Sequence, residues 1–237
     1  MAFDPASHRR KRRALQGRGE GRRDGAPQKL QSPASFFLYV EGPRDGEILR
    51  LWARRESPAL VKSLERCTMI LGGRQPARAV DHFLSQGGAQ SGQSGLVLLD
   101  RDHHVGDGIG WAEEPGLEVF TWSRRHIESY LLVRDTIARL LSDEMPAGVV
   151  AEVIRTHIPP PEAEDIFREL DAKRLLGING ALARELGRPI SAAEIARTMR
   201  LDELHSDVRG LLERIQVGLG LSPRTPEVVR RPRGSHR

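Results

Sequence analysis

The chain has little sulfur chemistry and little to hold it in a membrane. Its single cysteine, Cys67, excludes an internal disulfide bond and a metal site built from several thiolates, and we expect it to be a small buried side chain. No apolar run reaches the length of about 18 residues that a membrane span requires, and the charged N-terminus lacks the apolar segment of a secretory signal. We therefore expect a protein of the reducing cytoplasm, without membrane contact.

Several catalytic signatures are also missing. There is no Gly-x-x-x-x-Gly-Lys-Ser/Thr loop to bind ATP phosphates, and no Gly-x-Ser-x-Gly turn to present a serine nucleophile. The only tyrosines, Tyr39 and Tyr130, lie inside a strand-like run and on an apolar helical stripe. ATP hydrolysis by this chain and covalent catalysis through serine or tyrosine are therefore not expected.

Charge is distributed unevenly along the 237 residues, whose net charge is +5. Residues 1–33 carry nine Lys/Arg against three Asp/Glu, and residues 224–237 carry five against one. The stretch between them, 34–223, is therefore net −5. Basic ends suit sequence-independent contact with phosphates, although tails that only improve solubility have the same composition.

The hydrophobic pattern divides the remainder into an alternating part and a helical part. Up to residue 133, short apolar runs alternate with helical periods, which predicts a parallel sheet with helices on both faces. The expected strands are 36–40, 67–71, 95–99 and 117–121, and the expected helices are 45–56, 75–86 and 123–132, with Ser123 as the N-cap of the last. We therefore predict a catalytic α/β domain at 34–133 and disordered basic tails at 1–33 and 222–237.

From residue 134 to 221 only helical periods occur, and they predict a helical extension. The expected helices are 134–143, 147–157, 161–176, 180–187, 191–199 and 202–217. Ser191 and Glu194 have the spacing of a capping box, which marks the start of one of these helices.

Two acidic motifs stand where predicted strands end. Glu41 and Asp45 follow the first strand, and Asp100 and Asp102 follow the third. The carboxyl ends of parallel strands share one edge, so these carboxylates are expected to meet. A hard divalent cation, Mg²⁺ or Mn²⁺, is the usual way to stabilise such a group. The alternatives are an ordinary surface turn for the first motif and an Asp-rich helix cap for the second.

These motifs resemble those of the Toprim domain, which occurs in topoisomerases, bacterial primases and the OLD (overcoming lysogenization defect) nucleases. The resemblance lies in Val-Glu-Gly-x-x-Asp (40–45), Ile-Leu-Gly-Gly (70–73), Leu-Leu-Asp-Arg-Asp (98–102) and Arg-x-Ile-Glu-x-Tyr-Leu-Leu (125–132). The last segment is similar to the OLD group in particular. The resemblance covers 36–132 and, more loosely, 160–217, where Ala172 replaces the glycine of a Gly-Lys-x-Leu-Leu helix start.

The resemblance implies a Toprim-like Rossmannoid fold and a two-metal site. The implied metal ligands are Glu41, Asp45, Asp100, Asp102 and Glu128, and the implied catalytic residues are Glu41, Asp100, Asp102 and Lys173. In such a site the ions activate water and stabilise the leaving oxygen of a phosphodiester. Glu128 has an alternative as a helix-surface residue paired with Arg124 or Arg125.

Five residues are candidates by position. Arg124 and Arg125 open a predicted helix near the acidic motifs and are candidate phosphate ligands, with a solvated helix face as the alternative. His103 and His104 follow the acidic pair directly, where a metal contact or a proton relay is conceivable. Lys173, one of only two lysines in 34–223, is also a candidate phosphate contact, with a solvated helix residue as the alternative.

Together these features predict a metal-dependent nuclease of the OLD-like Toprim type that hydrolyses DNA, which we favour over RNA, in phage defence or DNA maintenance. Full-length OLD proteins fuse an ATPase to this domain, so a separate ATPase subunit is an expected partner. The main alternative is a non-catalytic subunit that binds nucleic acid or an ATPase. Nucleotidyl transfer, as in primases, is less favoured because the chain has no zinc-binding segment and no polymerase domain. A phosphohydrolase with an Asp-x-Asp nucleophile is also less favoured, because there the pair follows the first strand, whereas here it follows the third. The sequence leaves the oligomeric state open.

Overall fold

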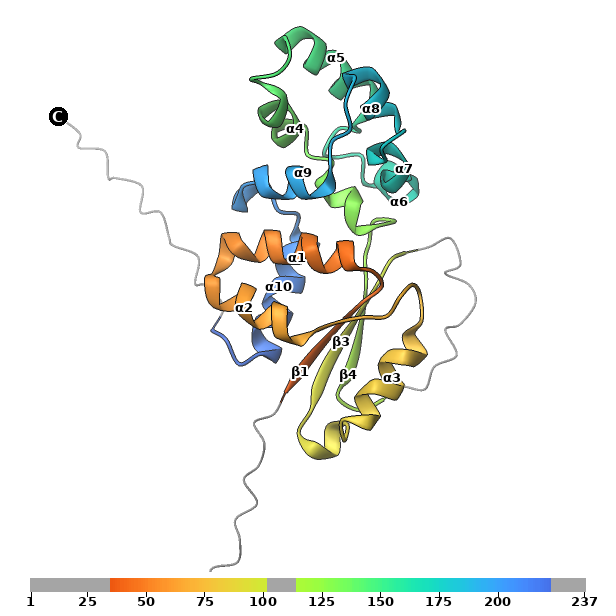
Figure 1. Cartoon of the computed structure of the whole chain (residues 1–237), viewed down its shortest axis with the longest axis vertical. Coiled ribbons are helices and arrows are strands. Elements are labelled where there is room, and N and C mark those ends of the chain that lie inside the picture. Colours follow the sequence, from red (N-terminus) through yellow and green to blue (C-terminus); the bar gives the residue numbers. More distant parts are fainter. Residues whose placement is uncertain (1–34, 102–113, 223–237) are drawn as a thin grey trace, which may run out of the picture. The chain divides into compact units, whose positions relative to one another are not determined.

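The strands of the computed structural model form one parallel sheet in the order β2-β1-β3-β4 (Figure 1). The structure describes residues 35–101 and 114–222. The strand bounds are β1 Phe36–Val40, β2 Thr68–Ile70, β3 Ser94–Leu99 and β4 Leu117–Thr121. The four predicted strands are therefore confirmed, with shifts of one residue at the ends of β2 and at the start of β3.

Both faces of the sheet are covered, as the alternating pattern predicted. Successive side chains of a strand point to opposite faces. Leu38 and Val40 of β1 belong to a large apolar cluster with helices α1, α2 and α10, while Tyr39 belongs to a smaller one with α3. The bounds of these helices are α1 Pro43–Glu56, α2 Pro58–Cys67, α3 Pro76–Ser85 and α10 Ser206–Gly218. The fold class is thus α/β, with a parallel sheet between helical layers.

The helix α2 was absent from the sequence-based prediction. It begins at Pro58, directly after Ser57, whose hydroxyl accepts a hydrogen bond of 3.1 Å from the Leu60 N–H. Pro at the first helical position and Ser at the N-cap are strong start signals that the apolar pattern alone did not reveal. As a result Cys67 ends a helix instead of starting a strand, although it is buried as expected.

The predicted helix over 123–132 is wrong. Bends occupy 123–126, and only a short 3₁₀ helix, η2 (Ile127–Leu131), follows. Ser123 caps no helix, because its hydroxyl lies against Tyr130 and Asp207, and the Arg125 carbonyl accepts from the Arg101 N–H at 3.0 Å. Contacts with distant residues therefore replace the helical hydrogen bonds.

The predicted helical region is helical, with finer divisions. Its elements are α4 Arg134–Leu141, α5 Ala147–His157, α6 Glu164–Glu169, α7 Ala172–Leu176, α8 Ala181–Leu186, α9 Ala192–Thr198 and η3 Leu201–Glu203, before α10. The predicted helix 161–176 is two helices, because Asp171 caps a new start by accepting from the Arg174 N–H at 2.9 Å. The capping box of Ser191 and Glu194 is confirmed, with hydrogen bonds of 3.1 and 2.8 Å.

The helical region and the sheet share one apolar cluster. Buried side chains of α4, α5, α9 and α10 join those of β1 and β3 in it, and the Trp52 indole N–H lies 3.2 Å from the sulfur of Met199. At the far end of α10, Gly218 lies so close to the Phe36 ring that a Cβ would clash with it. None of the helices in the described ranges has the length and apolarity needed to cross a bilayer. The predicted basic tails lie almost wholly outside those ranges.

Candidate active site at the carboxyl edge of the sheet

Glu41 and Asp100 lie side by side, immediately after the neighbouring strands β1 and β3. The Asp100 backbone N–H donates a hydrogen bond of 2.9 Å to Oε1 of Glu41. Parallel pairing of β1 with β3 is what brings these residues, 59 positions apart, to one edge. Both halves of the acidic pattern thus meet in the described structure.

The turn after β2 holds the backbone of this edge in place. The N–H groups of Gly72 and Gly73 donate to the Glu41 carbonyl at 3.1 and 2.8 Å. Their φ angles, 78° and 113°, lie in the left-handed region that glycine adopts without strain. Nη1 of Arg74 then donates to the Asp100 carbonyl at 2.7 Å. Sequence analysis gave Arg74 no role; its position after the Gly-Gly turn was the available signal.

Lys173 reaches the same edge from helix α7. Its ammonium nitrogen lies 2.5 Å from Oδ2 of Asp100, whose Oδ1 accepts from the Ile127 N–H at 3.3 Å. Burial alone would lower the pKa of Lys173, but the hydrogen bond and charge of Asp100, with the charges of Glu128 and Asp45, raise it above its ordinary value. Lys173 therefore stays protonated and supplies the positive charge of the cluster.

Two further carboxylates at this edge have few compensating partners. Burial raises the pKa of Asp45 above its ordinary value, opposed by the 2.7 Å hydrogen bond that its Oδ2 accepts from the Gly42 N–H. Burial also raises the pKa of Glu128 to about 6, opposed by Lys173 and reinforced by the charges of Asp100 and Asp45. These mutual effects show that the four groups form one electrostatic cluster, which we call the acidic site (Asp45, Asp100, Glu128 and Lys173, with Glu41 beside Asp100).

Glu128 lies deepest in the acidic site. Its side chain is only 2% exposed, Oε1 lies 3.7 Å from Nη1 of Arg44, and the buried Oε2 has no hydrogen-bond partner. The helix-surface alternative, with Arg124 or Arg125 as partner, is therefore wrong, because Glu128 is buried and faces α1 instead. Arg44, which sequence analysis passed over, is 63% exposed and stands at the entrance to the site.

His126 is a second residue that sequence analysis did not single out. It is buried next to the acidic site, where burial and the charge of Lys173 lower its pKa, opposed by Asp100. The ring is therefore mainly neutral near pH 7. Its place two residues before Glu128 was visible in the sequence, but nothing in the pattern indicated that the ring is buried.

The donor set fits a hard divalent cation in its chemistry. Carboxylate oxygens are the ligands that Mg²⁺ and Mn²⁺ prefer, and the partnerless Oε2 of Glu128 is the kind of buried atom that a bound cation satisfies. Among the described residues, however, no three His, Cys, Asp or Glu side chains are grouped closely enough to hold one ion. Asp102, His103 and His104 lie outside the described residues.

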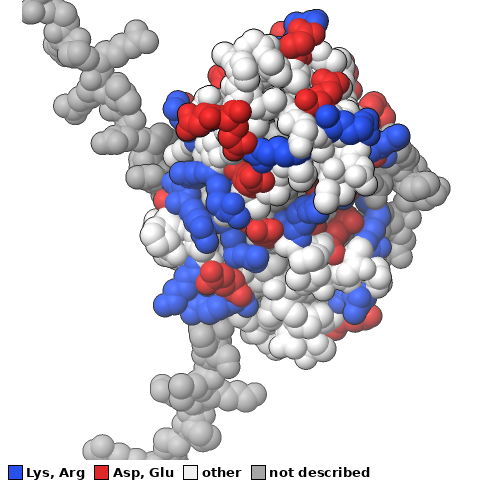
Figure 2. Space-filling model, turned by 45° about the horizontal axis from the view of Figure 1, so that its top comes forward, with Lys and Arg blue, Asp and Glu red and all other residues white. Residues whose placement is uncertain are grey.

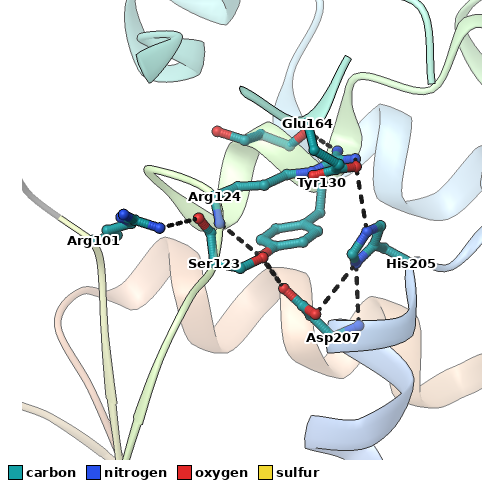
Figure 3. A network of polar contacts seen from close by, with 8 residues as sticks. Arg101, Ser123, Arg124, Tyr130, Glu164, His205 and Asp207 are labelled. Carbon is teal, nitrogen blue, oxygen red and sulfur yellow. Dashed lines mark hydrogen bonds and ion pairs between the residues drawn. The ribbon is translucent and has the colours of Figure 1, made fainter. Parts of the chain in front are cut away.

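The side chains of the two candidate phosphate ligands donate hydrogen bonds to other parts of the protein. Arg124 is buried and donates through Nε and Nη2 to the Glu164 carboxylate (Figure 3). Its Nη1 donates to the Ser129 carbonyl at 3.0 Å, and its guanidinium carbon lies 3.9 Å from the centre of the Phe167 ring. Arg125 donates to the Glu169 carbonyl at 3.2 Å. The structure therefore gives Arg124 a packing position, with its donors directed at protein acceptors.

Arg124 belongs to a polar network that ties α6 and α10 to η2 (Figure 3). At its centre the Tyr130 hydroxyl lies 2.6 Å from Oδ2 of Asp207 and accepts from the Arg124 backbone N–H at 3.1 Å. His205 lies 3.5 Å from the Glu164 carboxylate. We call this set the Arg124 network (Ser123, Arg124, Tyr130, Glu164, His205 and Asp207). Because α7 directly follows α6, the network also fixes the segment that carries Lys173.

Comparison with known proteins gives structural similarity only. No family model matches the chain, and no curated protein matches it. Among solved structures, the chain is similar to the C-terminal region of the Burkholderia pseudomallei OLD protein, with a TM-score of 0.45 and 15% identity over 78% of this chain and 98% of that one. It is also similar to the C-terminal region of the Xanthomonas campestris pv. campestris OLD protein, with a TM-score of 0.43 and 16% identity over 79% and 97%. Such identities transfer no residue roles.

Proposed function

We propose that this protein is a metal-dependent phosphodiesterase that cuts nucleic acid, with DNA favoured over RNA. The observation that carries the proposal is the convergence of Asp100, Asp45 and Glu128 with Lys173 at the carboxyl edge of a parallel sheet. Metal-dependent phosphodiester hydrolysis needs a site for hard cations and is helped by a fixed positive charge near the phosphate, and the acidic site has the residue types for both. The Toprim and OLD assignments belong to this proposal.

The residues that would hold Mg²⁺ or Mn²⁺ are Glu41, Asp45, Asp100, Glu128 and, two positions after Asp100, Asp102. Bound there, the metal would activate water and stabilise the leaving oxygen. The buried carboxylates of Asp45 and Glu128, whose pKa values are raised by burial, would lose protons on loading. Metal binding is therefore expected to release protons, with that of Glu128 leaving near pH 6.

Lys173 is the residue that we assign to the phosphate. An ammonium group has three N–H donors, so it can hold Asp100 and a phosphate oxygen at the same time. Its side chain is 43% exposed, unlike that of Asp100, so a substrate phosphate has access to it. We assign Lys173 to stabilise the negative charge that grows on the phosphate as the bond breaks.

One observation favours a second candidate function. Lys173 forms an ion pair with Asp100, so the protein itself compensates part of the negative charge of the site. A non-catalytic subunit that binds nucleic acid or an ATPase would need no more than this. A role in phage defence and an association with a separate ATPase subunit both belong to the proposed nuclease function. Co-purification tests the association with an ATPase.

The test is cleavage of plasmid DNA and total RNA with Mg²⁺, Mn²⁺ or EDTA. Asp100→Asn is compared with Asp165→Asn, a matched control whose carboxylate is 94% exposed on α6. We expect metal-dependent cutting that falls by at least about 100-fold in Asp100→Asn, the size typical for loss of a catalytic electrostatic group, and stays unchanged in the control. Cutting that persists in EDTA or in Asp100→Asn would contradict the proposal. Binding without cutting by wild-type protein would favour the non-catalytic alternative.

A further inference from the structure

The outer face of α1 carries a row of arginines that begins at the acidic site. The inner face of this helix is apolar and buried, with Ile48 and Trp52 fully enclosed. Arg44 and Arg54 are exposed on the outer face, and Arg50 is half-buried between them. At 1.5 Å per residue, Arg44 and Arg54 stand about 15 Å apart along the helix axis. Arg44 contacts Glu128, so the row starts at the candidate active site.

The row leads into a groove between α1 and α2. The groove has a volume of about 480 Å³ and is lined by Arg54 and Lys62, together with Glu65 and two apolar side chains. Lys62 is exposed, as is Arg66 four residues later on α2. Two helices thus present cations to one open depression.

A third segment extends the same basic surface. The Arg55 guanidinium donates to the Arg197 carbonyl of α9, and the side chains of Arg197 and Arg200 are exposed beside it. In Figure 2 Lys and Arg side chains gather in a patch on the left of the molecule, where α1 and α2 lie in Figure 1. Glu47, Glu56 and Glu65 interrupt this surface, so its excess of positive charge is modest.

The excess is nevertheless local. Helices α1 and α2 together hold six Lys/Arg against four Asp/Glu, one of which is the buried Asp45, whereas residues 34–223 as a whole are net −5. A generally arginine-rich composition therefore does not account for the patch. A surface that is basic on an acidic body attracts a polyanion to one place.

We infer that the α1–α2 surface (Arg44, Arg50, Arg54, Arg55, Lys62 and Arg66) binds the phosphate backbone of the nucleic acid next to the bond that is cut. The inference rests on the proposed function, and it adds the path that the polymer takes from the acidic site. A duplex carries one phosphate per strand for about every 3.4 Å of its axis, so a row of about 15 Å matches roughly four phosphates of one strand. Contacts of this kind hold the polymer in position without selecting a sequence.

The test separates binding from cutting. Fluorescence anisotropy with a labelled DNA duplex of about 20 base pairs, in EDTA and at several salt concentrations, is measured for Arg54→Ala/Lys62→Ala. The matched control is Arg168→Ala/Arg184→Ala, which removes the same charge from exposed positions on α6 and α8. We expect the Kd to rise about tenfold in the first variant, with a salt slope smaller by about 2, and to change little in the control.

A charge-preserving variant completes the design. Arg54→Lys/Lys62→Arg is expected to restore the wild-type Kd and salt slope, since a phosphate contact needs the charge more than the shape. Equal binding by Arg54→Ala/Lys62→Ala and wild type, or no binding of DNA by wild type, would overturn the inference. If Arg54→Ala/Lys62→Ala binds weakly while Asp100→Asn still cuts, the surface stands and the proposed active site fails. If Asp100→Asn loses cutting but all variants bind DNA alike, the proposed active site stands and the binding surface fails.

Discussion

The acidic site and the Arg124 network are both polar, both partly buried and both built around carboxylates. Yet the pKa values of Asp45 and Glu128 in the acidic site and those of Glu164 and Asp207 in the network are shifted in opposite directions. In the network the hydrogen bond from Arg124 lowers the pKa of Glu164, and hydrogen bonds from Ser123 and Tyr130 outweigh burial to lower that of Asp207. In the acidic site burial prevails and raises the pKa values of Asp45 and Glu128. Burial is common to the two regions, and the supply of donors is what differs. Carboxylates that are buried with too few donors are typical of sites that await a ligand.

The strongest way to break this comparison is to remove the lysine whose ammonium group contacts the Asp100 carboxylate. Lys173→Met keeps the length of the side chain but loses the charge. We expect kcat for metal-dependent cleavage to fall by about 10²–10³, as for other groups that stabilise transition-state charge, with a much smaller change in KM. Arg174→Met, at the exposed neighbouring position on α7, is the control. A kcat within twofold of wild type would leave Lys173 with a structural role only.

The next largest effect is expected in the network. Arg124→Ala removes a buried guanidinium together with its bonds to Glu164 and Ser129 and its stacking on Phe167. We expect the free energy of unfolding, measured with urea, to fall by about 3 kcal/mol, the loss typical of breaking a buried ion pair. Arg155→Ala, which breaks an ion pair whose side chains are 71% and 61% exposed, should leave the free energy of unfolding almost unchanged, because solvent screens such a pair. Similar losses for the two variants would show that Arg124 is no anchor.

The smallest effect sharpens the contrast through its sign. The pKa of Glu128 rises from 4.5 to about 6 on folding, so the folded protein binds the proton more tightly, and Glu128 makes folding less favourable as the pH rises from about 4.5 to 6. Without metal, Glu128→Gln is therefore expected to raise the free energy of unfolding at pH 7.5 by about 1–2 kcal/mol and to change it little at pH 4.5. Asp207→Asn should instead lower the free energy of unfolding at both pH values. The pKa of Asp207 is lowered, so its contribution to stability is lost only as the pH falls below about 4. Urea unfolding at both pH values measures this, and a loss of stability for Glu128→Gln at pH 7.5 would contradict it.

The sheet and the edge where the acids meet were within reach of the sequence. Short apolar runs that alternate with helical segments identify β1, β3 and β4. The rule that the carboxyl ends of parallel strands share one edge then places Glu41 beside Asp100 from the sequence alone. Lys173 came from the resemblance, since nothing local in its helix indicates a partner 73 residues away.

What escaped prediction depends on contacts between distant side chains. Serine is a typical N-cap residue, but the Ser123 hydroxyl donates a hydrogen bond to Asp207, 84 residues later, instead of capping a helix. Arg124 looks like a solvated charge until Glu164 and Phe167 are placed around it. Glu128 faces Arg44 of α1, and no helical spacing could have paired those two residues. In each case local propensity was overridden by a partner that the chain supplies only through its tertiary fold.

The packing of α10 against the sheet has a consequence for the protein as it is synthesised. Ile215 and its neighbours on α10 complete the apolar cluster that contains Leu38 and Leu96, and Gly218 lies against Phe36 of the first strand. On the ribosome, β1 and β3 emerge long before α7 and α10, so the sheet face that α1 and α2 cover stays incomplete at first, and Asp100 lacks its lysine. A nascent chain that stalls before residue 173 therefore cannot assemble the acidic site. A chain that stalls between α7 and α10 has all the residues of the acidic site, but its apolar core still lacks the side chains of α10.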